Sequence, residues 1–439
     1  MILSDQNDKN RRWSLIRSNN RRFIQLPQNR FFEPEEYHLD FGNFRLLPQR
    51  VARKHSSSKS GLSNSSVKHI IPKGSKYNHL DNWSFVNGTL YFKYKTTELW
   101  WRMPKNYSFE DSHSDLFKLA EFVLLSPLEP GILDDWIPSR KPGNRPGLAF
   151  SAGLDSTAAM ELLPEQTVLF YHKRSGFDSK LDHTNALRFI EHLQQEHNRS
   201  VIIVESNHEI ILKLHEGRPP GFMTDYACAV HAILLADHLS LDSIATGMPL
   251  ENSFLWHGQR FRNFGESWFW KKHAPLFQSI GLEILQPVMG CSEIVNQSIV
   301  KQSGYIEYAQ SCLRSASKEP CGLCWKCFRK NSISGKKIEV SNEIHTFLSK
   351  PKLKMAASTL YSIQRLQGMS PVFDKIITRY PSVSEHIDVD VSFLEEHYEP
   401  SLELIPERYR GYVERRLMAF VAKQSNVKHL EEFNLYSEN

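Results

Sequence analysis

The chain has 439 residues, of which 40% are hydrophobic and 23% charged. This composition is typical of a globular protein of two or three domains and excludes a collagen-like, coiled-coil or wholly disordered chain. The formal net charge is +5, yet residues 1–75 hold 14 Lys or Arg and 6 Asp or Glu, so the remainder is slightly acidic.

The first 75 residues are predicted to form a basic arm without a packed core. A serine-rich run at 56–66 has no apolar period that could be buried, so we expect disorder here. The arm could contact phosphates or an acidic surface, whereas the acidic remainder argues against a nucleic-acid-binding core. The chain does not open with a signal-peptide pattern and has no run of 18 apolar residues, so we expect a cytoplasmic protein that does not contact a membrane.

Residues 76–147 change to a β-rich pattern. The dipeptide Asn87-Gly88 separates two runs of β-branched and aromatic residues, Trp83–Val86 and Thr89–Tyr94, and this predicts a hairpin with a type I′ turn. A further strand is predicted at 99–102 and a helix at 116–125. We therefore expect a small β-rich N-terminal module that ends in the Pro- and Gly-rich loop 138–147.

From residue 148 the chain alternates between strands and helices. We predict strands at 148–150, 167–171, 200–204, 243–247 and 282–288, a helix beginning near 157, and helices at 183–197 and 224–239. Such alternation indicates an α/β fold in which a parallel sheet is sandwiched by helices. We place this domain at 148–335 and a helical C-terminal extension at 336–439.

The segment Ser151-Ala152-Gly153-Leu154-Asp155-Ser156-Thr157 follows a buried strand and opens a helix. This is where a parallel sheet binds phosphate, because the free N–H groups of a helix N-terminus point at the anion. Gly153 would let the backbone approach closely, and Asp155 could cap the helix or help to hold Mg²⁺. The loop is not a Walker A motif, and a capped helix without a ligand is the alternative.

Four cysteines, Cys312, Cys321, Cys324 and Cys327, fall within 16 residues. Two residues between thiolates let a short loop wrap a tetrahedral ion, and Gly322 would allow the required turn. A closed shell of four thiolates suits structural zinc, with an iron–sulfur cluster as the alternative.

The loop resembles the PP-loop of the ATP pyrophosphatases in the HUP superfamily, where the usual pattern is S-G-G-x-D-S and Ala152 replaces the first glycine. With C-x8-C-x2-C-x2-C following about 160 residues later, residues 148–333 resemble the 7-cyano-7-deazaguanine synthase (QueC-like) family. Thr246-Gly247 and Ser292–Val295 also match. Cys291 stands where the family has a lysine, and the family's acidic loop after Thr-Gly is replaced by residues 251–258, followed by a Trp-rich insertion.

The resemblance implies a ligase that uses ATP and Mg²⁺, with zinc at the cysteines. A carboxylate, for example of a 7-deazaguanine, would attack the α-phosphorus and release pyrophosphate, and the acyl adenylate would become an amide, a nitrile or a conjugate. Extended relatives occur in bacterial antiphage gene cassettes, so a protein acceptor is one expected partner. The implied nucleotide-binding residues are Ser151, Ala152, Gly153, Leu154, Asp155, Ser156, Thr157, Thr246 and Gly247. The expected catalytic residues are Ser151, Asp155, Lys173 and Arg218.

Two other functions remain open on the sequence. A tRNA-modifying PP-loop enzyme of the thiolating type would need a reactive cysteine, for which Cys228 or Cys291 would have to serve. A non-catalytic nucleotide-binding scaffold would recruit a partner through its termini. His172 is a candidate general base or a structural residue, and Trp256, Trp268 and Trp270 could stack on a heterocycle or pack in the core.

Overall fold

The structure is a computed structural model that describes residues 80–128, 132–133, 136–175, 181–211, 222, 224–310, 312–314, 319–334, 336 and 338–436, and the backbone of four N-terminal strands. The chain divides into two compact units, Met1–Pro72 and Lys73–Asn439.

The first unit holds a four-stranded sheet with the order β1-β2-β3-β4. The strands are β1 (Ile2–Ser4), β2 (Arg12–Ser18), β3 (Arg21–Gln25) and β4 (Phe44–Leu46). We expected a largely disordered arm in which some order is possible near residues 41–47. The structure pairs these four segments, which satisfies their backbone hydrogen bonds. The serine-rich run 56–66 lies outside the described residues.

The second unit is built on an eight-stranded sheet with the order β14-β11-β8-β9-β10-β7-β6-β5. Five of its strands are parallel, and three at one edge are antiparallel. The parallel strands are β8 (Arg145–Ala149), β9 (Val168–Arg174), β10 (Val201–Ser206), β11 (Leu241–Thr246) and β14 (Glu283–Leu285). The structure therefore has the mostly parallel α/β sheet that we predicted.

The order of the parallel strands determines where a ligand site can form. Numbered along the chain, they lie in the order 3-2-1-4-5, so the direction of winding reverses between β8 and β11. In open α/β sheets, ligands bind outside the carboxyl ends of the strands at such a reversal. The loops that follow Ala149 and Thr246 flank this position.

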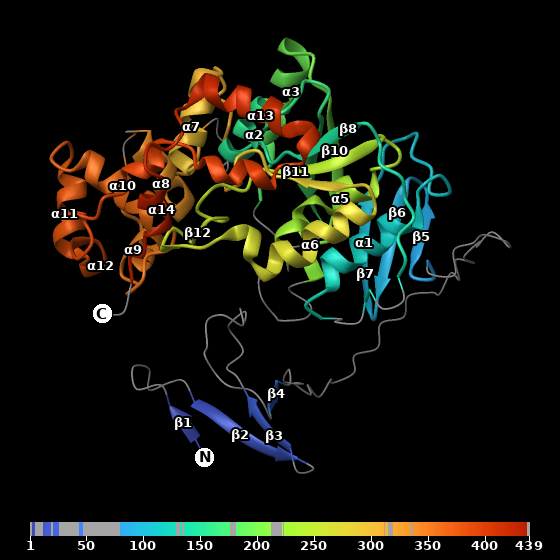
Figure 1. The fold of residues 1–439 in the computed structure, drawn as a ribbon, viewed down its shortest axis with the longest axis horizontal. Helices are drawn as coiled ribbons and strands as arrows, with labels where there is room; N and C mark the ends of the chain where they lie inside the picture. The colour runs from blue at the N-terminus through green and yellow to red at the C-terminus, as the bar shows by residue number, and fades with distance from the viewer. Residues whose placement is uncertain are drawn as a thin grey trace, which may run out of the picture. The chain divides into compact units, whose positions relative to one another are not determined.

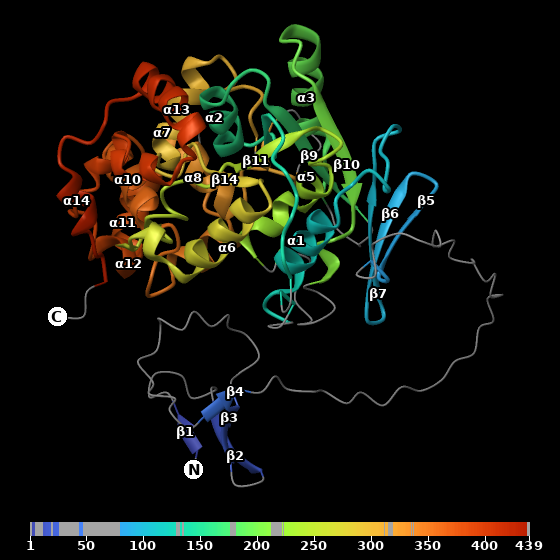
Figure 2. The same cartoon turned by 45° about the vertical axis from the view of Figure 1, so that its right-hand side comes forward.

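The predicted hairpin is present as β5 (Trp83–Val86) and β6 (Thr89–Tyr94), and β7 (Thr97–Arg102) pairs with β6. Asn87 and Gly88 have φ angles of 50° and 75°, as a type I′ turn requires. Strand β7 also pairs with β10 at Trp101 and Ser206. The strands that we predicted as a separate module thus extend the main sheet, at the edge beyond β10 in Figure 2.

Helices cover both faces of the sheet because its strands alternate their apolar side chains. Val168 and Phe170 of β9 pack in one core with α1 (Ser114–Leu125), α5 (Val230–Leu234) and α6 (Trp268–Ser279). Leu169 and Tyr171 pack in a second core with α2 (Leu154–Leu162), α3 (Thr184–Glu196), α7 (Glu293–Gln302) and α13 (Glu407–Phe420). Figure 1 shows α13, from the C-terminal extension, beside α2.

The long helix predicted at 224–239 is wrong. A 3₁₀ helix spans Asp225–Ala229, α5 spans only Val230–Leu234, and turns lead into β11. Bonds between residues three apart, from the Ala227 N–H to the Thr224 carbonyl and from the Ala236 N–H to the Ile233 carbonyl, tighten both ends. The apolar run that suggested a helix is buried against the sheet. Its apolar residues therefore indicate that the segment is buried, and they do not determine how long its helix is.

The predicted C-terminal helices form a third core with the hairpin β12 (Leu255–Trp256) and β13 (Arg260–Phe261). They are α9 (Asn342–Leu348), α10 (Ala356–Leu366), α11 (Pro371–Arg379), α12 (Pro381–Ser384) and α14 (Val427–Glu431). The same core holds α8 (Trp325–Ile333), which precedes the predicted extension. Among the described residues, we find no helix with the length and apolarity needed to cross a bilayer.

Candidate functional site

The loop after β8 presents the start of α2 at the point where the winding reverses. Gly153 is the N-cap of α2 and makes no side-chain cap, which leaves the first-turn N–H groups available to an anion. Ser151 is exposed, whereas Ser156 and Thr157 are buried and donate their hydroxyls to the Gly153 carbonyl. The structure therefore gives the Ser151 hydroxyl access to a ligand and uses the other two to hold the loop.

Ala152, and not Gly153, has the unusual backbone conformation in this loop. Its φ is 57°, whereas that of Gly153 is −95°. An L-residue in the left-handed region costs roughly 1–2 kcal/mol, and glycine does not pay this cost. The glycine that the PP-loop pattern usually has at position 152 therefore matches a backbone requirement that this chain meets with a buried alanine.

Thr246 and Gly247 lie next to this loop, as the resemblance implied. A Cβ atom on Gly247 would lie 2.6 Å from the Ser156 amide nitrogen, so the turn after β11 touches the first turn of α2. The Thr246 hydroxyl donates to Gln286 Oε1 at 2.7 Å. Glycine is required at 247 because two backbones meet there.

Replacing Gly247 by alanine is expected to destabilise the protein by about 1–3 kcal/mol, because the added methyl group would have to displace the backbone of α2. The matched control is Gly411→Ala in α13, where the nearest atom to a new Cβ is the Arg415 guanidinium at 3.5 Å. That change should stabilise the helix by up to ~1 kcal/mol. Urea unfolding of both variants measures the difference, and equal stabilities would refute the close approach.

Asp155, in the first turn of α2, is held by groups from two distant helices. It accepts a hydrogen bond from Asn296 Nδ2 at 3.1 Å and pairs with Lys330 Nζ at 3.4 Å. Burial would raise the pKa of this carboxyl, but the ammonium groups of Lys330 and Lys326, together with Asn296, hold the pKa below its usual value. Asp155 is therefore ionised at neutral pH and is the acidic centre of the site.

Two polar atoms around the loop have no hydrogen-bond partner among the described residues. They are Asn296 Oδ1, beside Asp155, and Gln286 Nε2, beside Thr246, and both side chains are fully buried. Buried polar groups are nearly always satisfied, so each such atom calls for a ligand or a water molecule. Asp155 and Asn296 together offer the oxygen ligands that Mg²⁺ prefers.

A buried ionic network connects the turn after β11 with the helices around the site. Glu251 accepts from the Glu293 N–H at 3.0 Å and from the Ser358 hydroxyl, and Glu293 pairs with Arg329. Burial and the nearby Glu293 raise the pKa of Glu251 to about 7. The network joins the turn after β11 to α7, α8 and α10, so the C-terminal helices take part in positioning the site.

The four predicted metal ligands come together. Their sulfur atoms all lie within 4.8 Å of one another, and those of Cys321 and Cys327 are 3.7 Å apart. A tetrahedral zinc ion with Zn–S bonds of about 2.3 Å requires sulfurs about 3.8 Å apart. A four-iron cluster binds each cysteine through a different iron and needs a wider spacing. The four cysteines are therefore close enough to bind one metal ion such as zinc.

The backbone around the cysteines has the turn that the sequence predicted. Gly322 has a φ of 70°. The Cys321 N–H donates to Cys312 Sγ and the Cys327 N–H to Cys324 Sγ, both at 3.4 Å. Cys324 is also the N-cap of α8, the helix that carries Lys326, Arg329 and Lys330. The cysteine cluster thus lies at the start of the helix whose side chains reach Asp155.

The other predicted catalytic residues fall elsewhere. Lys173 lies at the carboxyl end of β9, 3.7 Å from Glu205 of β10, and no contact joins it to Asp155 among the described residues. Arg218 lies outside the described residues. Cys291, which occupies the position of the family's lysine, is fully buried, and burial together with Glu251 raises its pKa. The cations at Asp155 come from α8 instead.

The aromatic candidates are divided between core and surface. Trp256 is buried beneath the Arg262 guanidinium, whose carbon lies 4.8 Å from the ring centre. Trp270 packs against Phe264, and Trp268 is exposed beside Lys272.

His172 is structural. It stacks on His208 with ring centres 4.3 Å apart and on His231 at 5.5 Å, and the stack lies in the core between the sheet and α5. Burial lowers the pKa of His208 to about 3 and that of His231 to about 4. For His172, burial, the other two histidines and Arg174 lower the pKa well below its usual value. All three rings are therefore neutral in the folded protein.

This stack predicts a loss of stability in acid. Unfolded histidine titrates near pH 6.5, so each neutral buried ring contributes stability that declines as the pH falls below 6.5 towards the folded pKa. For His231 the loss at pH 5 is about 2 kcal/mol. The raised pKa of Glu251 makes the folded state more stable as the pH falls, which is opposite to the effect of the histidines. His231→Leu is therefore compared with wild type, which also contains Glu251, by urea unfolding at pH 7.5 and at pH 5. The variant should gain about 2 kcal/mol relative to wild type between the two values, and parallel pH profiles would contradict the neutral stack.

Sequence reasoning missed Asn296, Lys326 and Lys330. A signal was present for the lysines, since they are four residues apart on the helix that starts in the cysteine cluster and so share one face. No local signal connected that face with a loop about 170 residues earlier.

Comparison with known proteins adds one match. A family of unknown function (DUF6395) matches residues 272–430, a range that includes part of α6, the cysteine cluster and most of the C-terminal helices but not the Ser151 loop. Neither the curated proteins nor the solved structures provide a match.

Proposed function

We propose that the protein is an ATP-dependent adenylating ligase of the PP-loop class, with a QueC-like domain of HUP type. The observation that carries this proposal is the uncapped N-terminus of α2 at the reversal of the sheet, with Asp155 held between Asn296 and Lys330. Helix N–H groups, lysines and a carboxylate beside an amide oxygen are what the phosphates of ATP and their Mg²⁺ require.

The proposed reaction starts when a substrate carboxylate oxygen attacks the α-phosphorus of ATP. A C–O–P bond forms, the bond from the α-phosphorus to the oxygen that bridges to the β-phosphate breaks, and pyrophosphate leaves with that oxygen. The first-turn N–H groups of α2 and the ammonium group of Lys330 would stabilise the negative charge that develops on the leaving group. Mg²⁺, held by Asp155 and Asn296, would supply further charge neutralisation.

In this proposal zinc has a structural role. Four thiolates close its coordination shell and leave no position for water or substrate. The ion would hold the start of α8 and, through that helix, the two lysines of the site.

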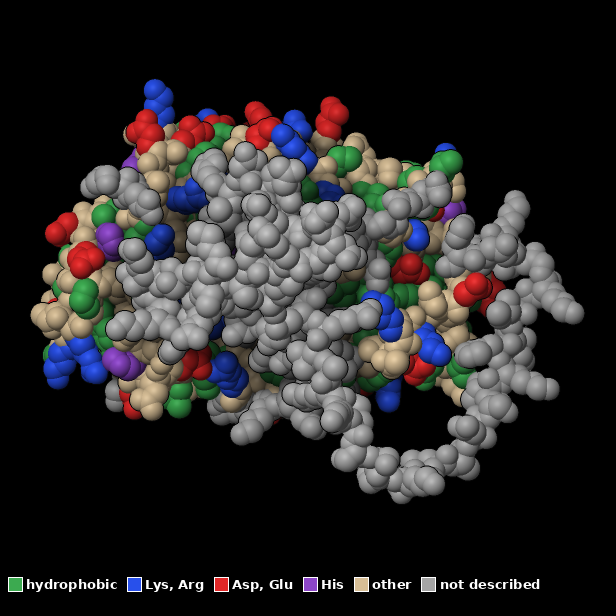
Figure 3. Space-filling model, turned by 90° about the horizontal axis from the view of Figure 1, so that it is seen from below, with side chains coloured by type: hydrophobic (Ala, Val, Ile, Leu, Met, Phe, Trp, Pro, Cys, Tyr) green, Lys and Arg blue, Asp and Glu red, His purple; other side chains and the backbone are tan. Residues whose placement is uncertain are grey.

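Two observations bear on the tRNA-modifying alternative. Thiolation needs an accessible thiolate, and of its two candidates Cys291 is fully buried with a raised pKa, whereas Cys228 is partly exposed. If the protein body recognised RNA, we would expect a surface on which positively charged side chains cluster. On the described part of the face in Figure 3, Lys and Arg side chains are interspersed with Asp and Glu along the upper rim.

The test is exchange of labelled pyrophosphate into ATP by the full-length, zinc-loaded protein, with a panel of carboxylic acids that includes 7-carboxy-7-deazaguanine. We expect exchange that depends on Mg²⁺ and on one class of acid. A protein that fails to bind a non-hydrolysable ATP analogue at millimolar concentration would exclude the proposal. Nucleotide binding without exchange by any acid would favour the scaffold interpretation.

A further inference from the structure

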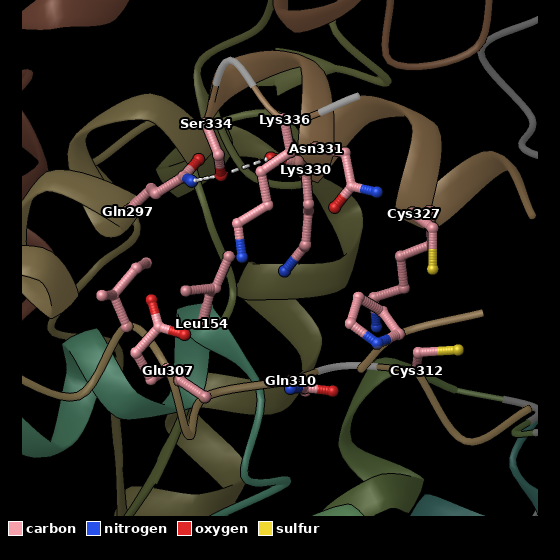
Figure 4. Close-up of a pocket in the computed structure, with 14 residues that line it drawn as sticks. Leu154, Gln297, Glu307, Gln310, Cys312, Cys327, Lys330, Asn331, Ser334 and Lys336 are labelled. Atoms are coloured by element: carbon pink, nitrogen blue, oxygen red, sulfur yellow. Dashed lines mark hydrogen bonds between the residues drawn. The ribbon is translucent and has the colours of Figure 1, made fainter. Parts of the chain in front are cut away.

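A cleft lies between the metal centre and the start of α2. It has a volume of about 60 Å³ and is open to solvent. Leu154 of the nucleotide loop forms one wall, Cys312 and Cys327 lie at another, and the C-terminal half of α8 covers it (Figure 4). The cleft thus adjoins both candidate sites while its lining belongs mostly to neither.

Cationic side chains dominate this lining. Lys326, Lys330 and Lys336 all border the cleft, and Figure 4 shows Lys330 and Lys336 extending into it opposite Leu154 and Glu307. Lys336 is turned back over the cleft because its N–H donates to the Asn331 carbonyl at 2.9 Å, just beyond the end of α8.

The lining holds more lysines than carboxylates. Lys330 is paired with Asp155, which leaves Lys326 and Lys336 against Glu307, the one acidic residue of the lining. A carboxylate can accept charge-assisted hydrogen bonds from both ammonium groups.

A buried polar atom also points to a ligand. Gln297 is 6% exposed and donates its amide to Ser334, while its Oε1 has no partner among the described residues. The amide groups of Gln297, Gln310 and Asn331 surround the lysines, and such groups commonly hydrogen-bond the polar edge of a planar molecule.

We infer that this cleft binds the carboxylate-bearing small molecule that the enzyme activates. Lys326 and Lys336 hold its carboxylate, and the amides contact its body. Since Lys330 also touches Asp155, a carboxylate held there lies beside the phosphates of a nucleotide bound at α2. This inference rests on the proposed function, and it assigns substrate binding to residues outside the nucleotide loop.

The test compares two probes of nearly the same shape, of which one is an anion and the other is neutral. Binding of 4-fluorobenzoate and of the neutral 4-fluorobenzamide to the full-length, zinc-loaded protein is followed by ¹⁹F NMR. We expect the benzoate to bind at least about tenfold more tightly, and Lys326→Gln and Lys336→Gln each to weaken it about tenfold. The control is Lys301→Gln, on the exposed side of α7 and outside the cleft, which should change binding less than about twofold.

Equal binding of the two probes, or benzoate binding that no cleft lysine affects, would overturn the inference. So would displacement of benzoate by a non-hydrolysable ATP analogue, since the cleft would then be part of the phosphate site. The lysines could instead only balance the net negative charge of a zinc tetrathiolate. In that case their variants lose zinc, measured by metal analysis, and benzoate binding does not depend on charge. If the protein binds benzoate in a lysine-dependent way but binds no nucleotide, the cleft is an anion-binding site and the proposed function is wrong.

Discussion

Replacing Cys324 by serine is expected to release the metal ion and to lower the free energy of unfolding by more than about 3 kcal/mol, because metal binding is coupled to folding. Serine is a good N-cap, so the start of α8 keeps its cap and the loss is attributable to the metal. Zinc content by metal analysis and urea unfolding measure the two effects. Nucleotide-analogue binding should also weaken, because α8 carries Lys330 to Asp155.

The control is Cys228→Ser, which makes the same chemical change outside the cluster and should retain one equivalent of metal. A Cys324→Ser protein that is soluble, metal-free, as stable as wild type and fully active would show that the cluster is not a structural metal centre. Loss of activity in Cys228→Ser with zinc retained would instead favour the thiolating interpretation.

Replacing Asp155 by asparagine should reduce pyrophosphate release by at least about 10²-fold, since the change removes the one carboxylate at the proposed phosphate and Mg²⁺ site. The side chain keeps its shape, so the loop can keep its geometry. The lost charge also removes the ion pair with Lys330, whose side chain is 11% exposed, and this should cost roughly 1–3 kcal/mol of stability. Exchange of labelled pyrophosphate and urea unfolding are the measurements.

Asp388→Asn is the matched control, because Asp388 is exposed in the C-terminal helical region. It should leave both quantities unchanged. An Asp155→Asn variant that is folded, binds Mg²⁺–nucleotide as wild type does and releases pyrophosphate at the wild-type rate would remove Asp155 from the mechanism.

The sequence alone was sufficient for features that depend on neighbouring residues. The Asn87-Gly88 turn, most strands of the parallel sheet and the four clustered cysteines follow from local backbone preference, from alternation and from ligand spacing. Each of these signals is contained within about 20 residues of chain, so no knowledge of packing was needed.

Local patterns failed where a segment's partners lie far along the chain. The stretch 224–239 is as apolar as a buried helix, yet its contacts with the sheet leave only a short one. Strands β5 to β7 carry a clear hairpin pattern. Their union with β10 depends on the pairing of Trp101 with Ser206 and on hydrogen bonds from Asn207, which no local pattern encodes.

Tertiary structure also decided which cations face Asp155. Lys173 lies at the carboxyl end of the neighbouring strand β9 and was an expected choice, yet Lys330, 175 residues beyond Asp155, makes the contact. A helix can direct a lysine at a carboxylate only once its own position is fixed, and here the position of α8 is fixed by the cysteine cluster at its start and by the core that it shares with the C-terminal helices. The sequence thus identified the loop and the metal ligands, while the packing of distant helices determined how they are joined into one site.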